Sequence, residues 1–120
     1  TTVTDHPFEQ AIVNGREVNR ETPAEILGKK IVYRGATLQP RDMFDIAATA
    51  VVLGEHALVA SLKPLAEASG VALKVARGMN PGLARTVMSR LMARPDYQDL
   101  YLTAQDVACR VLQRVAGETR

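Results

Sequence analysis

The sequence has few aromatic residues and no tryptophan. Phenylalanine and tyrosine together make up 4% of its 120 residues. A platform that stacks the bases of single-stranded nucleic acid needs exposed aromatic rings, so this composition argues against one. Cys109 is the only cysteine, which excludes a disulfide framework and a cysteine-based metal cluster. It falls in an apolar helical pattern, where an inert buried thiol is the usual interpretation.

Long apolar runs are also missing. None reaches the roughly 18 residues of a membrane span, so we expect no membrane association. The N-terminus lacks the apolar stretch of a signal peptide, and the cytoplasm is the expected compartment. Hydrophobic residues make up 47% and charged residues 23% of the chain, as in a globular protein that buries a core.

Charge is unevenly distributed although the net charge is only +2. Residues 1–45 hold six basic and seven acidic side chains, whereas residues 74–94 hold five basic ones and no acid. A local basic run can attract phosphate. Arg77, Arg85 and Arg90 are therefore candidates for binding nucleic acid, and a solvated helix face is the alternative interpretation.

The N-terminal end favours strands. Two short strand-like runs, Phe8–Val13 and Glu17–Glu21, flank the pair Asn14-Gly15. Such a pair between two strands indicates a hairpin, because both turn positions prefer positive φ. A hairpin alone is not stable. These strands must pack on the helices or belong to a sheet whose other strands are missing here.

The rest of the chain favours helix. Capping and turn residues predict helical segments over residues 23–33, 40–52, 56–68, 71–78 and 81–93, and after Thr103. The first begins with a capping box from Thr22 to Glu25. Pro64 is expected to kink or split the third segment, and Gly70 to close it.

We therefore predict an α+β chain, a short hairpin followed by a mostly helical bundle. Residues 1–22 would form the end of a sheet, and residues 23–120 a helical region packed with it as one unit. In the segment from Pro81, the buried stripe is expected to consist of four apolar residues, Leu83, Val87, Met88 and Leu91.

Two neighbouring helices carry the residues closest to chemistry. Lys30 and Arg34 lie one turn apart, an arrangement tolerated in water or favoured when an anion sits between them. Asp42 falls in the first turn of the next helix, where the dipole favours a carboxylate. Asp45 lies between apolar neighbours, so it must sit at the core edge or pair with a cation. Lys30 and Arg34 are the natural partners if the helices pack antiparallel.

Two interpretations of these charges remain open. They form either a structural ion-pair network that joins the helices or part of a functional site. The spacing of Asp42 and Asp45 could also suit a divalent metal, but the nearby cations would compensate them and no third oxygen ligand is evident. His6 and His56 lack metal-ligand spacing, and the serines lack a nucleophile context.

Three consecutive motifs resemble those of a known family, the AbiEii/AbiGii-type nucleotidyltransferase toxins. That family carries an E-I-x-A-x-K-L helix, then an arginine, then R-D-L-x-D-L on the next helix. The matching runs here are Ala24–Ile31, Tyr33–Gly35 and Arg41–Ala47. The lead-in from Thr4 to Pro7 and the hairpin also resemble the strands before that helix. Beyond about residue 52 the likeness is a loose helical region.

The resemblance implies a polymerase-β-type enzyme that transfers a nucleotide from an NTP to an acceptor such as the end of a tRNA. It implies Mg²⁺ in the complete enzyme and a cognate antitoxin as partner. The motif residues imply catalytic roles for Lys30, Asp42 and Asp45. Lys29, Arg34 and Arg41 would bind substrate phosphate, as cations offset the charge of a transferring phosphoryl group.

The family's metal site is missing from this sequence. It needs a Gly-Ser/Thr turn followed by an Asp-x-Asp-like pair on an early strand, and Asp5 is a lone acid. Without those carboxylates two-metal transfer is not expected, and no cofactor is expected for this chain alone. We interpret the chain as a fragment, a split gene product or the C-terminal region of a larger enzyme. Gly28 also replaces the family's alanine.

The function predicted from the sequence is therefore the C-terminal part of a nucleotidyltransferase toxin, catalytically incomplete alone. The alternative is a non-catalytic interaction module or a subunit of a split enzyme. In that case a partner chain would supply the strands that the hairpin lacks.

Overall fold

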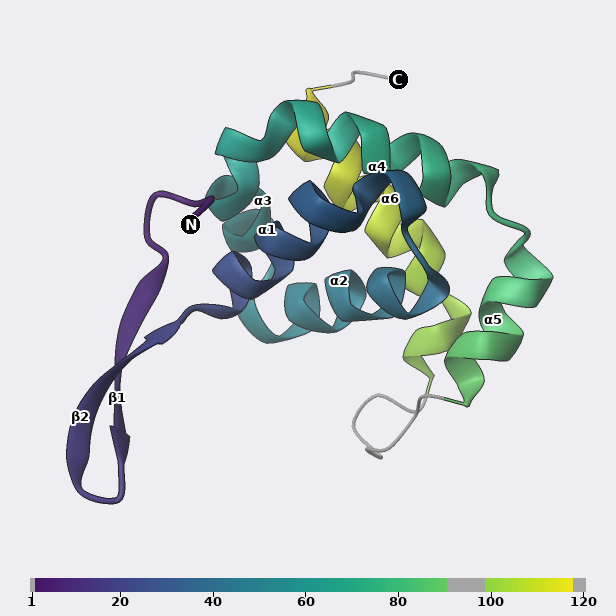
Figure 1. Cartoon of the computed structure of the whole chain (residues 1–120). Helices are drawn as coiled ribbons and strands as arrows, with labels where there is room; N and C mark the ends of the chain where they lie inside the picture. Colours follow the sequence, from purple (N-terminus) through teal and green to yellow (C-terminus); the bar gives the residue numbers. More distant parts are fainter. Residues whose placement is uncertain (1, 91–98, 118–120) are drawn as a thin grey trace.

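A computed structural model gives the fold and describes residues 2–90 and 99–117. An antiparallel hairpin, β1 (Phe8–Val13) and β2 (Arg16–Glu21), is followed by helices (Figure 1). The α-helices are α1 Pro23–Arg34, α2 Pro40–Leu53, α3 Glu55–Leu62, α4 Ala66–Gly78, α5 Pro81–Ser89 and α6 Ala104–Ala116. Short 3-10 turns occur at η1 Gly35–Thr37, η2 Lys63–Leu65 and η4 Leu100–Leu102. The predicted α+β class, hairpin first, is confirmed.

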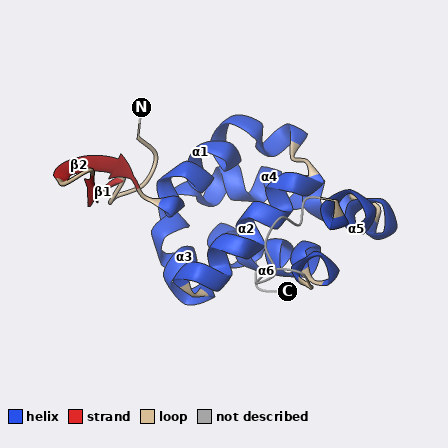
Figure 2. Ribbon diagram, turned by 90° about the horizontal axis from the view of Figure 1, so that it is seen from below, coloured by secondary structure: helices blue, strands red, loops and turns tan. Residues whose placement is uncertain are grey.

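The hairpin forms as the turn sequence predicts. Asn14 and Gly15 both have positive φ, at 52° and 79°. Phe8 pairs with Glu21, and the register runs to Val13 opposite Arg16. Figures 1 and 2 both show the hairpin projecting from one end of the molecule, with α5 at the other end.

The helices enclose one core. α6 packs against α2, α3 and α4, and α1 packs against α2 and α4. The fully buried side chains come from all of these helices and include Ile31, Met43, Leu58, Leu73 and Leu112. Glu55 at the start of α3 accepts hydrogen bonds from Arg110 (2.6 Å) and Arg114 (2.8 Å) of α6. The hydrogen bond from Arg110 is the main reason that the pKa of Glu55 lies below its ordinary value.

Of the two boundaries predicted around the third helical segment, one was wrong and one is confirmed. Gly70 does not end a helix, because α4 runs without a break from Ala66 to Gly78. A helical glycine costs only about 1 kcal/mol, and Ser69, Ala72 and Leu73 form a buried stripe that spans the position. The predicted split near Pro64 is confirmed, since η2 separates α3 from α4.

The stripe predicted for α5 was wrong for two of its residues. Leu83 is 69% exposed and Val87 is 44% exposed, whereas Met88 is buried as predicted. The buried face of α5 consists of Ala84 and Met88, which lie one turn apart. α5 packs on α2, and these two residues rather than Leu83 and Val87 face the core. Leu91 and the predicted end of this helix at residue 93 lie outside the described residues.

Glu25 anchors the segment that leads into the hairpin. One of the two hydrogen bonds of the predicted capping box is present, because the Thr22 hydroxyl accepts from the Glu25 N–H at 3.1 Å. The Glu25 carboxylate does not return to Thr22. It is fully buried and accepts from the Val3 N–H (2.9 Å), the Thr4 N–H (2.9 Å) and the Thr4 hydroxyl (2.7 Å). A second predicted cap, at Thr103, makes no side-chain hydrogen bond.

Gly28 permits this N-terminal segment to lie against α1. A Cβ at position 28 would sit 3.0 Å from Val3 Cγ2 and 3.0 Å from Leu65 Cδ1, closer than nine in ten real Cβ contacts. Close packing against Val3 and Leu65 therefore explains why glycine occupies the position where the toxin family has alanine.

No single helix in the described ranges is long and apolar enough to cross a membrane. Within those ranges, α2 and Glu55–Gly78 together have the length and composition of a span, but the two are bent by 115° relative to each other.

Replacing Glu25 by Gln should destabilise the protein by about 1–3 kcal/mol, because an amide cannot accept from all three donors. Burial raises the pKa of Glu25, but hydrogen bonds from Thr4 and Val3 and the charge of Lys29 outweigh it and hold that pKa below 4.5. This contribution is therefore present above about pH 4.5 and is lost as the pH falls through the lowered pKa of the folded state.

Urea unfolding between pH 3 and pH 7 measures this effect. The difference between wild type and Glu25→Gln should shrink in acid. Glu17→Gln, at an exposed site on β2, is the matched control and should change stability little. A constant difference at every pH would contradict the anchoring role of the carboxylate.

Candidate functional site

Two ion pairs join α1 to α2. Lys30 Nζ lies 2.7 Å from Asp45 Oδ2, and Arg34 Nη2 lies 3.3 Å from Asp42 Oδ2. The later residue on α1 pairs with the earlier residue on α2, so the helices run antiparallel across this contact. We call Lys30, Arg34, Asp42 and Asp45 the interhelix cluster. The predicted pairing of Asp45 with a cation of α1 is thus present in the structure, whereas the pair of Arg34 and Asp42 was not predicted.

Asp42 is the buried member of the interhelix cluster. Its side chain is 1% exposed, and its Oδ2 accepts from the Gln39 N–H at 2.9 Å as well as facing Arg34. Its Oδ1 is buried and has no hydrogen-bond partner in the described part of the chain. A buried carboxylate is costly unless compensated, and Arg34 and the N-terminus of α2 provide that compensation.

Lys30 and Asp45 form the accessible ion pair of the cluster, and the side chain of each is 32% exposed. The pair borders a shallow groove of about 260 Å³ between α1 and α2. Pro23, Ile26 and Thr49 also border this groove, and the Thr49 hydroxyl donates to the Asp45 carbonyl at 2.7 Å. A ligand could therefore reach the ammonium of Lys30 from solvent.

The structure does not bring the other two motif cations into the cluster. Lys29 forms an ion pair with Glu21 of β2, and that hydrogen bond raises the pKa of Lys29. Its contact therefore joins α1 to the hairpin. Arg41 is exposed and makes no ion pair among the residues that the structure describes.

The predicted nucleic-acid residues separate into two groups. Arg77 of α4 and Arg85 of α5 line one pocket of about 350 Å³, together with Tyr101, Asp106 and Cys109. Sequence spacing could not show this meeting, because the two arginines are eight residues apart on different helices. Arg90 is exposed at the C-terminal end of α5 and does not line that pocket.

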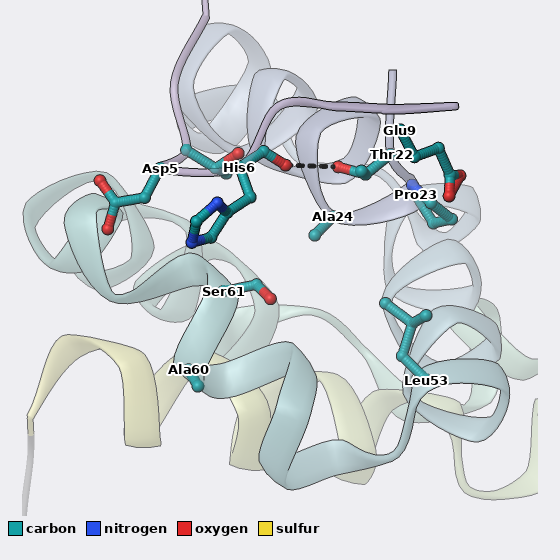
Figure 3. Close-up of a pocket in the computed structure, with 10 residues that line it drawn as sticks. Asp5, His6, Glu9, Thr22, Pro23, Ala24, Leu53, Ala60 and Ser61 are labelled. Carbon is teal, nitrogen blue, oxygen red and sulfur yellow. Dashed lines mark hydrogen bonds between the residues drawn. The ribbon is translucent and has the colours of Figure 1, made fainter. Parts of the chain in front are cut away.

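A third pocket, of about 240 Å³, lies at the base of the hairpin (Figure 3). Its polar lining includes Asp5, His6, Glu9 and Ser61, none of which sequence reasoning selected. The Thr22 hydroxyl donates to the main-chain carbonyl of His6 at 3.2 Å. No hydrogen bond joins the His6 imidazole to Ser61 among the described residues, so the arrangement is not that of an activated nucleophile.

The described residues contain no group of three or more His, Cys, Asp or Glu side chains placed to hold a metal ion. Asp42 and Asp45, the carboxylates nearest to each other in the motif, each face a cation instead. The interhelix cluster is therefore electrically neutral, with two cations and two anions.

No protein-family model, curated protein or solved structure matches the chain.

The two ion pairs of the interhelix cluster should contribute differently to the free energy of unfolding. Asp42→Asn should cost about 1–3 kcal/mol, because the buried group loses charge-assisted bonds. A double-mutant cycle of Lys30→Met and Asp45→Asn should give a coupling of about 1 kcal/mol or less, since that pair is partly solvated.

Urea unfolding at neutral pH measures both effects. Glu67→Gln on the exposed face of α4 is the control and should lie within about 0.5 kcal/mol of wild type. An Asp42→Asn variant as stable as wild type would show that the buried pair does not hold the helices together.

Proposed function

We propose that this chain is the C-terminal part of a nucleotidyltransferase toxin, with Lys30 facing a phosphate group of the nucleotide or acceptor. One observation carries the proposal. The charged residues of two separate motifs, Lys30 and Arg34 on α1 and Asp42 and Asp45 on α2, meet at one interface. The groove beside Lys30 and Asp45 gives a substrate access to the ammonium group.

The chemistry of Lys30 is compatible with both an ion pair and a phosphate contact. A lysine ammonium has three N–H donors, and one of them serves Asp45 at 2.7 Å. The remaining donors can contact phosphate oxygens and offset the negative charge that spreads over them during transfer. Asp45 acts as a positioning residue that fixes the ammonium on the groove side of α1.

Arg34 and Asp42 have a different role in this proposal. Asp42 is buried, so it does not reach the substrate directly. It orients Arg34, whose side chain is 45% exposed and whose fork of donors suits phosphate oxygens. Lys29 and Arg41 would add positive charge at the periphery, with Lys29 first having to leave Glu21.

The Mg²⁺ that the resemblance implies does not fit the described residues. Asp42 and Asp45 each face a cation, and no third ligand group accompanies them. The metal would instead be held by a partner segment with a Gly-Ser/Thr turn and paired aspartates. The proposed acceptor is an RNA such as tRNA, and a cognate antitoxin is the proposed regulatory partner.

A second candidate function rests on the hairpin. Phe8, Ile12 and Val13 of β1 are 52%, 76% and 49% exposed on a two-stranded unit that projects from the helices (Figure 2). Isolated hairpins are marginal in water, and a free strand edge can pair with another chain. A non-catalytic module that receives strands from a partner chain would use this element.

The purified chain should transfer no labelled nucleotide from Mg²⁺–NTP to RNA. The same chain should be active when it is expressed within the longest natural reading frame that contains it, joined to the segment that carries the paired aspartates. Lys30→Ala in that longer protein should reduce transfer about a hundredfold or more, as loss of a transition-state donor does. Lys63→Ala, at an exposed lysine of η2, is the control.

Two results would overturn the proposal. Robust transfer by the isolated chain would show that its site is complete, and unchanged transfer by Lys30→Ala would leave Lys30 a structural residue. Thermal unfolding of each variant separates loss of the fold from loss of chemistry.

The hairpin candidate makes a different prediction. If β1 receives a partner strand, Ile12→Lys should abolish co-purification of a chain encoded by a neighbouring gene. The same change should alter the free energy of unfolding by less than about 0.5 kcal/mol, because Ile12 is exposed. Arg16→Ala, in the same hairpin, is the control and should leave co-purification unchanged.

A further inference from the structure

The pocket between α4, α5 and α6 combines charges of both signs with an aromatic ring. Arg77 comes from α4, Arg85 from α5 and Asp106 from α6. Tyr101 of η4 is half-buried and lines the same space of about 350 Å³. That volume lies in the range of roughly 300–1,000 Å³ typical of small-molecule sites.

The two arginines define one end of a suitable ligand. Their guanidinium forks match the oxygens of a phosphate group better than a point charge would. They belong to different helices and line the same pocket, so one phosphate in it can contact both. Arg85 is exposed and makes no ion pair in the described ranges, so its donors are available to a ligand.

Asp106 restricts the ligand further. A carboxylate repels a simple anion, so its presence disfavours a site for phosphate alone. It accepts hydrogen bonds from hydroxyl or amine donors, and an acidic residue on a ribose hydroxyl is a recurrent way of holding nucleotides. The ligand that fits therefore carries a phosphate at one end and hydroxyl donors next to it.

Tyr101 supplies a surface for the remaining part of such a ligand. Aromatic side chains stack on bases of either class because every base has a π-face. Pro81 and Leu102 add apolar lining to the same pocket. One ring is enough for one base, so the scarcity of aromatic residues in the sequence does not count against a single-nucleotide site.

We propose that this pocket binds one phosphorylated ribonucleotide, with its phosphate on Arg77 and Arg85, its ribose hydroxyls on Asp106 and its base against Tyr101. The ligand is a free mononucleotide or the terminal nucleotide of an RNA, which share this chemistry. Its use as an acceptor site rests on the proposed transferase function. The binding itself does not, so the two can fail separately.

Cys109 provides a direct reporter for occupancy. It lines the pocket, is half-buried, and is the only cysteine in the chain. Burial raises the pKa of its thiol, so alkylation should be slow at neutral pH and faster as the pH rises. A nucleotide in the pocket should shield the thiol and slow its alkylation.

The experiment measures the alkylation rate of Cys109 in the full chain as ligand is titrated. Adenosine 5′-monophosphate, its 2′-deoxy form, adenosine, inorganic phosphate and a short 5′-phosphorylated RNA are the probes. We expect saturable protection by the ribonucleotide, weaker protection by the deoxy form, and little by adenosine or phosphate. Protection by RNA but not by the mononucleotide would identify the terminal nucleotide of an RNA as the ligand.

Three variants test the assigned contacts. Arg85→Ala should weaken protection about tenfold to a hundredfold, as loss of a charged hydrogen bond does. Arg90→Ala, from the exposed end of the same helix and outside the pocket, should leave it unchanged. Asp106→Ala, which removes the acceptor oxygens at an exposed position, should remove the preference for ribose over deoxyribose.

The proposal fails if no nucleotide or RNA protects Cys109, or if inorganic phosphate protects it equally well. It also fails if Arg85→Ala binds as tightly as wild type while circular dichroism shows both folded. Nucleotide binding without any transfer activity in the longer protein would keep this inference and overturn the proposed function instead.

Discussion

The buried carboxylate of Asp42 is the constraint on which the α1–α2 unit depends. A carboxylate that is 1% exposed needs compensation, which the Gln39 N–H and the guanidinium of Arg34 provide. Those two contacts fix the loop between the helices, the end of α1 and the start of α2 together. Lys30 and Asp45 then meet further along the same antiparallel interface. The geometry of the candidate site is therefore a consequence of compensating one buried charge.

Local sequence signals predicted the elements well where the physics is local. The Asn14-Gly15 turn produced the hairpin, and Pro23 and Pro40 mark the starts of α1 and α2. Prediction failed at Gly70 and Leu83, where packing between distant segments decided the outcome. Intrinsic preference for or against helix is worth about 1 kcal/mol per residue, and a buried stripe outweighs it.

The candidate site divides in the same way. Helical spacing and opposite charge were sufficient to predict that Asp45 pairs with a cation of α1, and Lys30 is that cation. The pairing of Arg34 with Asp42 was not predicted, because the position of Asp42 at the start of its helix already accounted for that carboxylate. Arg77 and Arg85 line one pocket because of where the chain places α5 after the end of α4, which no spacing encodes. Glu25 looked like an ordinary capping residue, and its contacts with Val3 and Thr4 arise only in the folded chain.

The interhelix cluster has a structural role that its contacts establish and a chemical role that remains our proposal. The two are compatible because an ion pair uses only part of the donor capacity of lysine and arginine. The most direct test is a crystal structure of the chain joined to its proposed metal-binding segment, with a non-hydrolysable NTP and Mg²⁺. We predict a phosphate oxygen within about 2.7–3.2 Å of Lys30 Nζ. A structure in which Lys30 contacts only Asp45 and the phosphates lie elsewhere would contradict the account.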